Sequence, residues 1–395
     1  MSVAGIVSEY NPFHMGHVRH IELTREALPG CSIVAVMSGN VVQRGEFAIM
    51  QKHARAEAAV RGGCDLVLEL PAAWALSSSE GFAAAAVYLL GALGQVTHLS
   101  FGCEAGSIDP LREVADALLN ERFPELLREE LSSGQSFASA RQKAAEKVLG
   151  RACSFMSKPN NILAIDYLKA LQALSLNLEP VAIKREGGAH DGKGGKYPSA
   201  MEIRELLFCG KEIPYSFLPE GSRKVLAREV EAGRAPVNYV NSERAILARL
   251  RALGDEELMV ADNSGEGLWR RFKQAAGSCT SVEGIIEAVK SKRYAHSRIR
   301  RMLMRAYLGL GVPAGRPPYL RVLAANSAGR ELLRSASKTA SLPIITKPAH
   351  VRRLSGEAQK AFLGEVRVTS LCSLAAPDIS AITPLDEWKR GPVML

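Results

Sequence analysis

Two histidines three positions apart, His14 and His17, are the residues of this sequence best suited to chemistry. They stand on either side of Gly16 in an HxGH pattern, just after an apolar run at residues 3–7. On the first turn of a helix, residues at i and i+3 share a face, so both imidazoles face one ligand. A helix N-terminus offers unpaired N–H groups and partial positive charge to phosphates, and glycine allows close approach of a nucleotide. The pattern therefore predicts stabilisation of charge on an α-phosphate as pyrophosphate leaves.

Less specific interpretations of the same pair exist. Histidines near a helix start also occur as capping residues, as surface residues or as half of a metal site. No further His or Cys cluster stands nearby to complete a zinc site, so we expect no protein-bound metal there. The position directly after the first strand of a βαβ series favours nucleotide binding.

The elements that position this pair are suggested by hydrophobic patterning. Short apolar runs alternate with helical patterns through the first hundred residues, which is typical of an α/β fold with a parallel sheet. The carboxyl ends of such strands meet at one edge, where ligands bind. We expect strands at 3–7, 32–37, 65–70, 98–102 and 180–184, and helices at 18–28, 50–61 and 79–93.

A catalytic domain is predicted for residues 1–210 and a mainly helical region for residues 211–395. In the second region we expect helices at 240–253, 267–276, 282–308 and 329–337, with short strands at 319–324 and 343–346. The net charge of +9 is uneven, because residues 211–395 carry 30 Lys and Arg against 18 Asp and Glu. Either a polyanion docks there or the surface is simply solvated.

The densest basic stretch spans residues 290–305. On one helix, Arg298, Arg301 and Arg305 would share a face suited to an RNA backbone, and Tyr294 would stack on a base or pack internally. A solvated basic face is the alternative. The candidate RNA contacts are Lys290, Lys292, Arg293, Tyr294, Arg298, Arg301 and Arg305.

The composition favours a cytoplasmic, enzyme-sized protein of more than one domain. No apolar stretch is long enough to cross a bilayer, and the N-terminus lacks a basic n-region and a cleavage pattern. The seven cysteines are scattered and never spaced as CxxC, so we expect reduced thiols and no disulfide-linked partner.

Long motifs in this chain resemble the bacterial tRNA(Met) cytidine acetate ligase family. They lie at residues 5–17, 34–46, 65–71, 100–104, 159–164, 292–294 and 319–323. The catalytic half of that family is similar to the HxGH nucleotidyltransferases, so the resemblance implies a Rossmann-like sheet. It also implies that acetate attacks the α-phosphate of ATP to give acetyl-adenylate. The wobble cytidine of elongator tRNA(Met) then takes the acetyl group on N4.

The resemblance implies His14 and His17 as catalytic residues and a set of ATP contacts. These contacts are Val7, Ser8, Glu9, Tyr10, Asn11, Pro12, Phe13, His14, Gly16, His17, His20, Gly102, Asn161, Arg185, Glu186, Ser199 and Arg204. A helix N-cap is the alternative role for Asn161. Mg²⁺ is expected from ATP chemistry, carried on the phosphates because no carboxylate cluster marks a metal site.

Four further positions bear on this interpretation. Met201 stands where a serine-rich phosphate loop usually has Ser or Thr, so Ser199, Arg204 and backbone N–H groups would have to supply the phosphate contacts. Arg44 follows the second strand and would contact phosphate or tRNA, or lie in a solvated loop. Asp65 and Glu69 sit at a sheet edge, where a structural role is expected.

Two other functions are compatible with these residues. One is an adenylyltransferase acting on a small phosphorylated acceptor, which would need no basic second half. The other is a nucleotide-responsive RNA-binding protein without turnover, which the substitution at Met201 allows.

Overall fold

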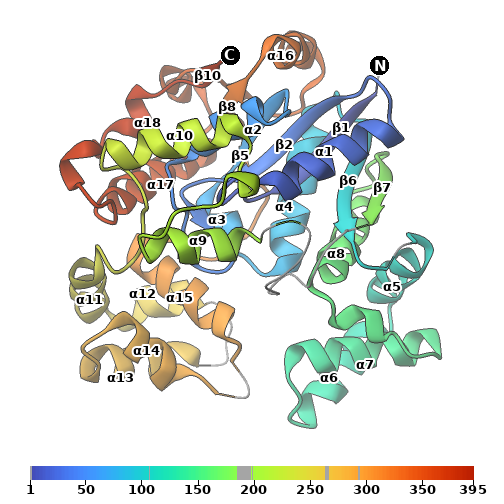
Figure 1. Ribbon diagram of the computed structural model, residues 1–395. Coiled ribbons are helices and arrows are strands. Elements are labelled where there is room, and N and C mark those ends of the chain that lie inside the picture. Colours follow the sequence, from blue (N-terminus) through green and yellow to red (C-terminus); the bar gives the residue numbers. More distant parts are fainter. Residues whose placement is uncertain (1, 106, 185–196, 198, 263–266, 292–293) are drawn as a thin grey trace.

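The computed structural model describes residues 2–105, 107–184, 197, 199–262, 267–291 and 294–395. Its centre is one sheet in the order β10-β8-β5-β2-β1-β6-β7, with short β9 paired to β8 (Figure 1). The strands of this sheet are β1 (Val3–Ser8), β2 (Ser32–Ser38), β5 (Leu66–Leu70), β6 (His98–Cys103), β7 (Glu179–Lys184), β8 (Leu320–Ala325), β9 (Ile344–Ile345) and β10 (Val393–Met394).

Strands β1, β2, β5, β6 and β7 are parallel, as the sequence predicts. Their order reverses at β1, because the chain moves from β1 to β2 and β5 on one side and to β6 and β7 on the other. Such a reversal is the switch point where open α/β sheets bind ligands. All the expected strands are present, each within one or two residues of its predicted bounds.

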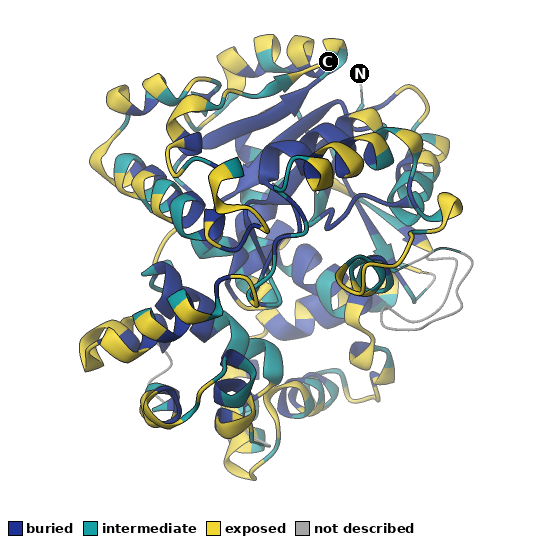
Figure 2. Cartoon of the chain, turned by 60° about the vertical axis from the view of Figure 1, so that its left-hand side comes forward, coloured by how far each residue is buried: buried dark blue, intermediate teal, exposed yellow. Residues whose placement is uncertain are grey.

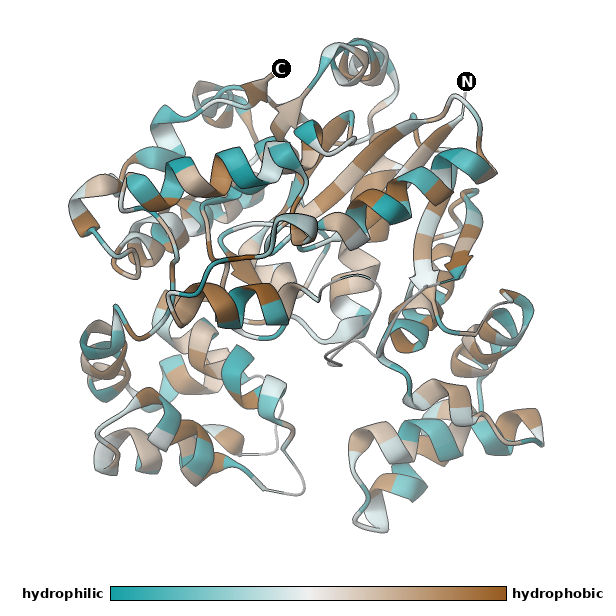
Figure 3. Ribbon diagram, in the orientation of Figure 1, coloured by the Kyte–Doolittle hydropathy of each residue, from teal (hydrophilic) through white to brown (hydrophobic). Residues whose placement is uncertain are grey.

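Strand β2 is buried along its whole length, and β1 is buried over its first four residues. Figure 2 shows these strands as a dark core beneath helices whose outer faces are exposed, and Figure 3 shows the matching apolar strands. The helices of the first half are α1 (Met15–Ala27), α2 (Lys52–Arg61), α3 (Ala72–Ala75), α4 (Ser79–Ala92), α5 (Asp109–Leu119), α6 (Phe123–Ser132), α7 (Phe137–Leu149) and α8 (Pro159–Ala173).

The second half is mainly helical, as predicted. Its helices are α9 (Ala200–Phe208), α10 (Glu220–Glu231), α11 (Glu243–Ala252), α12 (Asp255–Asp262), α13 (Leu268–Ser278), α14 (Val282–Val289), α15 (His296–Leu308), α16 (Ser327–Thr339), α17 (Gly356–Ser373) and α18 (Asp386–Lys389). The single helix expected at 282–308 is wrong. It is two helices, α14 and α15, because buried Tyr294 and a bridge between Ser291 and Tyr294 separate them.

The C-terminal segment also completes the sheet. Strand β8 pairs antiparallel with β5, and β10 pairs with β8, so residues beyond 210 contribute one edge. The boundary between two regions of the chain at residue 210 stays a prediction. No helix in the described part of the chain is long and apolar enough to span a bilayer.

A small antiparallel hairpin, β3 (Val41–Val42) with β4 (Glu46–Phe47), follows β2. A Cβ on Gly45, where φ is +77°, would overlap the backbone of Arg300 and Arg301. Glu46 forms an ion pair with Arg300. The hairpin therefore docks closely on α15, which ties that basic helix to the edge where β2 ends.

Candidate active site

The site begins where β1 ends, at the switch point of the sheet. Residues 9–13 form a tight connection in which Tyr10 has a φ of +43° and the Asn11–Pro12 peptide is cis. Helix α1 then starts at Met15, with His14 as its N-cap. The sequence predicted this strand, turn and helix start.

His14 and His17 form a reciprocal cap. Nδ1 of His14 accepts a hydrogen bond from the N–H of Gly16 at 3.0 Å, and Nδ1 of His17 accepts one from the N–H of His14 at 3.1 Å. The two rings lie 3.8 Å apart between centroids. The capping interpretation is therefore correct, and it has a chemical consequence. In a neutral imidazole with Nδ1 as acceptor, the proton is on Nε2, so each ring presents Nε2–H as its donor.

Gly16 is required by the His14 ring. A Cβ at this position would lie 2.9 Å from Cε1 and 3.0 Å from Nδ1 of His14. Such contacts are too short, so any larger residue would displace the ring and break its cap. The glycine predicted for nucleotide approach thus also sets the orientation of the first histidine.

The connection between β1 and α1 is anchored from several elements. Oδ1 of Asn11 accepts the N–H of Ile49 at 2.8 Å. Arg204 of α9 donates to the carbonyl of Asn11 at 2.8 Å, and Ser222 of α10 donates to the carbonyl of Phe13 at 2.7 Å. Sequence reasoning missed Ser222, because a serine near a helix start carries no signal for a contact so distant along the chain.

Arg204 was predicted to contact phosphate. In the structure its guanidinium is largely enclosed, and burial lowers its pKa although Glu46 and Glu9 act in the opposite direction. Its hydrogen bond to the carbonyl of Asn11 holds the turn. Ser199 is the N-cap of α9, accepting the N–H of Glu202 at 3.1 Å, with Met201 on the first turn of that helix.

Several predicted ATP contacts point their side chains into the protein. Tyr10 and Phe13 are buried, with the Tyr10 hydroxyl 3.5 Å from the Cys64 sulfur. Glu9 accepts the N–H of Gln43 at 2.6 Å, which links the turn to the β3–β4 hairpin. These residues shape the turn, and their contribution to a nucleotide would come from the backbone.

The neighbouring strand β6 supplies the other side of the switch point. Nε2 of His20 lies 3.0 Å from the Ser100 hydroxyl, which joins α1 to β6. Gly102 lies near the carboxyl end of β6. The structure thus brings His14, His17, His20 and Gly102 to one region of the sheet edge.

Asn161 lies near the start of α8 and is almost fully buried. Its Oδ1 accepts the N–H groups of Glu104 and Ala105 at 2.8 and 3.1 Å, and its Nδ2 donates to the carbonyl of Phe155 at 3.1 Å. The side chain therefore fixes the loop after β6. It is not the N-cap of its own helix, which is Lys158. Arg185 and Glu186 lie outside the described residues.

The candidate RNA contacts divide into two groups. Arg305 is 6% exposed and donates to the carbonyls of Ala261 and Leu76 at 2.8 Å each, so we assign it a structural role. Tyr294 is 5% exposed and carries Arg298 over its ring. Arg301 donates to the carbonyl of Gln43 at 3.5 Å, and burial lowers its pKa to about 10.

Arg301 and Arg305 of α15 are thus turned toward residues of the first half of the chain, Gln43 and Leu76. Lys290 is exposed beside Glu287, 3.3 Å away, and Arg298 is half-buried. Lys292 and Arg293 lie outside the described residues. Arg44, at the hairpin tip, is half-buried.

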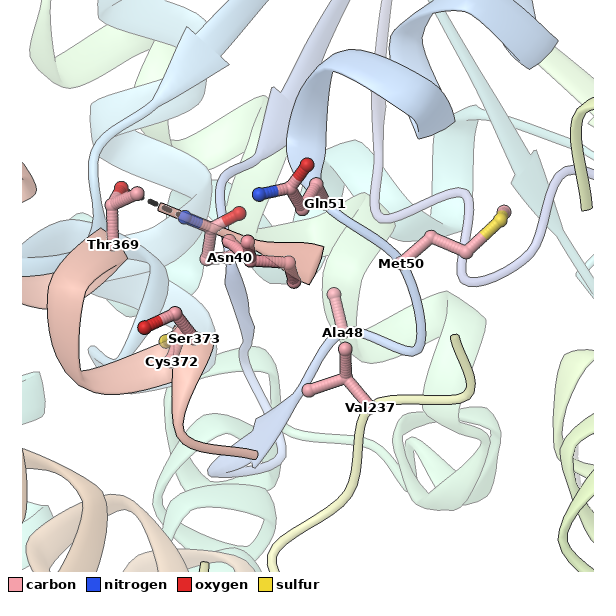
Figure 4. A pocket seen from close by; sticks show the side chains of 9 residues that line it. Asn40, Ala48, Met50, Gln51, Val237, Thr369, Cys372 and Ser373 are labelled. Carbon is pink, nitrogen blue, oxygen red and sulfur yellow. Dashed lines mark hydrogen bonds between the residues drawn. The ribbon is translucent and has the colours of Figure 1, made fainter. Parts of the chain in front are cut away.

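A small pocket lies between the loop after β2 and helix α17 (Figure 4). Nδ2 of Asn40 donates to Thr369, and Nε2 of Gln51 donates to Asp386. The polar atom of its lining that has no partner in the structure is an acceptor, Oε1 of Gln51. The pocket therefore favours a donor such as water, and a carboxylate such as acetate does not fit this chemistry.

Comparison with known proteins agrees with the geometry of the turn. A family model described as HIGH Nucleotidyl Transferase matches residues 1–383. The chain is 38% identical, over 91% of its length and 87% of the relative's, to a protein of Fervidobacterium nodosum named tRNA(Met) cytidine acetate ligase. The chain belongs to this family.

Two solved structures from Thermotoga maritima extend the likeness to three dimensions. The apo form of TmcAL has a TM-score of 0.95 and the form bound with alpha-thio ATP has 0.91, each at 33% identity and covering both chains fully. The family assignment and the fold class predicted from the motifs are confirmed. The family is one of enzymes, and its Thermotoga maritima member binds an ATP analogue.

Proposed function

We propose that this protein uses ATP to activate acetate and then acetylates N4 of the wobble cytidine of elongator tRNA(Met). The observation that carries the proposal is the reciprocal cap of His14 and His17 at the switch point, which directs two Nε2–H donors from one helix start. The names of its relatives and the nucleotide analogue bound in a structural neighbour support the same substrates. Cytoplasmic residence fits a tRNA substrate.

In the first step, a carboxylate oxygen of acetate forms a bond to the α-phosphorus. The bond from that phosphorus to the bridging oxygen breaks, and its electron pair leaves with pyrophosphate. No proton is transferred. The two Nε2–H groups donate to phosphate oxygens as charge builds on them, and donors of this kind contribute about 10²–10³ in rate each.

In the second step, the N4 amine attacks the acetyl carbon of acetyl-adenylate. AMP leaves with the electron pair of the carbon–oxygen bond, and the amine loses one proton to solvent. The cytosine amine is a weak nucleophile because its lone pair is delocalised into the ring. An activated anhydride is therefore needed, and the first step supplies it.

Mg²⁺ would accompany ATP, with the phosphate oxygens as its ligands. Carboxylates at this edge already accept protein hydrogen bonds, since Glu9 binds Gln43 and Glu104 binds the start of α8. Among the described residues, the group with metal-ligand spacing is Glu283, Glu287 and His296, which belongs to α14 and α15. Glu283 pairs with Arg300, and Glu287 pairs with Lys290 and lies 3.1 Å from His296.

The basic second half, residues 211–395, is the proposed tRNA-binding region, and residues 1–210 are the proposed catalytic region. Among the candidate RNA contacts that the structure describes, Lys290 is exposed and Arg298 is half-buried, so we propose these two as contacts to an RNA backbone. We expect Lys290→Ala and Arg298→Ala each to reduce the slope of log Kd for tRNA against log salt by about 1. Unchanged salt slopes in both variants would remove this surface from the proposal.

The decisive test is nucleoside mass spectrometry of tRNA(Met) incubated with the protein, ATP and labelled acetate. Labelled N4-acetylcytidine is the expected product, with AMP and pyrophosphate formed only when acetate is present. Pyrophosphate release that requires a different acceptor would favour an adenylyltransferase. No release at all would favour a nucleotide-responsive RNA-binding protein, and either result would refute the ligase.

A further inference from the structure

Arg55, on helix α2, has no exposed surface although it carries a charge. Its guanidinium donates to the carbonyls of Glu9, Ser38 and Gly39, and its Nε donates to the carbonyl of Met50 at 3.3 Å. The bond to Ser38 is 2.7 Å long. One side chain thus binds main-chain carbonyls from the segment just beyond β1 and from the end of β2.

No carboxylate forms an ion pair with Arg55 in the part of the chain that the structure describes. Burial lowers its pKa to about 10, while Glu9 and Glu69 act in the opposite direction at longer range. The group therefore stays charged at neutral pH. Burying a cation without a counter-ion costs several kcal/mol, which the hydrogen bonds from Arg55 to four main-chain carbonyls must offset.

The position of this charge indicates what Arg55 does. Carbonyl oxygens just beyond β1 and at the end of β2 converge on Arg55, and without a donor they would concentrate partial negative charge beneath the turn that is proposed to bind phosphate. Arg55 occupies three of these oxygens and puts a positive charge beneath the switch point. It also fixes the carbonyl of Glu9, directly before the turn that carries His14 and His17.

We propose that Arg55 is a positioning residue for the nucleotide: it sets the turn from Tyr10 to His17 and neutralises the partial negative charge of the carbonyls beneath that turn. This inference rests on the proposed use of ATP. It assigns Arg55 no contact with the reacting atoms.

The test compares Arg55→Lys and Arg55→Gln with a matched control, Arg305→Lys. Arg305 is also a buried arginine that donates to two carbonyls and has a pKa near 10, but it lies on α15. Lysine keeps the charge and cannot reach three carbonyls in the planar geometry of guanidinium. Calorimetry gives the Kd for ATP, and acetate-dependent pyrophosphate release gives kcat and KM.

We expect Arg55→Lys to weaken ATP binding at least about tenfold and to lower kcat about a hundredfold, the scale of a 1 Å misplacement. Arg55→Gln should lose more, because the charge is gone as well. Arg305→Lys should lower the unfolding midpoint with an unchanged Kd for ATP. If the parent binds ATP but yields no acetylcytidine, the proposed function fails while this comparison of ATP affinities still stands.

Three results would overturn the positioning role. One is that Arg55→Lys binds ATP and releases pyrophosphate as the parent does, and another is that Arg305→Lys loses as much ATP affinity. Failure of both Arg55 variants to fold, while Arg305→Lys folds, would assign Arg55 to folding alone.

Discussion

Two buried glutamates in one cluster are predicted to respond in opposite ways to the same substitution. Lys52 lies 2.6 Å from Glu69 and 2.8 Å from Glu387, and Arg321 lies 2.9 Å from Glu387. Glu365 is 4.0 Å from Lys52. All five side chains are at most 3% exposed.

Three carboxylates face two cations, so the cluster balances if one carboxyl is neutral. Burial and the nearby charges of Glu69 and Glu387 raise the pKa of Glu365 well above its usual value. Lys52 and Arg321 instead lower the pKa of Glu387 to about 2, against the effect of burial. We take Glu365 as the neutral member, since Lys52 already has two closer partners.

Glu387→Gln should therefore leave two buried cations sharing Glu69. Removing one partner of a buried pair costs about 3–5 kcal/mol, which is a large fraction of the stability of most proteins. Glu365→Gln replaces a neutral acid with a neutral amide of the same shape. The N–H of Ala72 keeps its acceptor there, at 2.7 Å in the parent, so the cost should stay below about 1 kcal/mol.

Urea unfolding of the parent and the two variants at pH 5 measures the difference, because close to the unfolded pKa the proton taken up by Glu365 on folding costs little. The expected order of midpoints is parent, then Glu365→Gln close to it, then Glu387→Gln far below. Equal losses in the two variants would show that Glu365 is ionised and would refute this assignment of charges. A neutral effect of Glu387→Gln would refute the pairing itself.

The same two glutamates should make the free energy of unfolding depend on pH. The stability that Glu387 contributes is present above its unfolded pKa of about 4.5 and is lost as pH falls toward 2. The stability that Glu365 contributes is lost as pH rises above about 4.5, because its pKa is raised in the folded protein. Unfolding at pH 5 to 8 should then show the parent losing stability relative to Glu365→Gln, and a constant difference would contradict the raised pKa. His17→Asn should lower the rate of acetate-dependent pyrophosphate release about 10²–10³-fold with little change in the unfolding midpoint, and a change in KM alone would argue against donation in the transition state. Gly45→Ala should cost more than about 2 kcal/mol because it combines backbone strain with overlap against α15, whereas Gly134→Ala, at φ +80° with open space around it, should cost about 1 kcal/mol; equal losses would contradict the close docking of the hairpin.

The parallel strands and the histidine pair at the start of α1 were accessible from the sequence because both are local signals. A buried parallel strand is a continuous apolar run, and a histidine pair at the start of a helix has a fixed spacing. The placement of both at the switch point followed from the order of the elements. The expected structural role of Glu69 and Asp65 also agrees with their buried contacts to Lys52 and to the N–H of Ile33.

The break between α14 and α15 was not accessible in the same way. Both helices keep an apolar period, and no glycine or proline stands between them. The interruption depends on burial of Tyr294, which is a tertiary contact. For the same reason the arginines of α15 looked like a solvent face, although hairpin β3–β4 covers part of it.

The buried charges explain why the two halves are best treated as one folding unit. Lys52 and Glu69 come from the first half, whereas Arg321, Glu365 and Glu387 come from β8, α17 and α18. A sequence pattern reads each of them as a surface residue, since their pairing exists only once β8 has paired with β5. Without the C-terminal segments, Lys52 and Glu69 would lose the ion pairs with Arg321 and Glu387 and become open to water. We therefore expect the conformation of the connection between β1 and α1, which β2 and α2 support, to depend on residues more than 300 positions away.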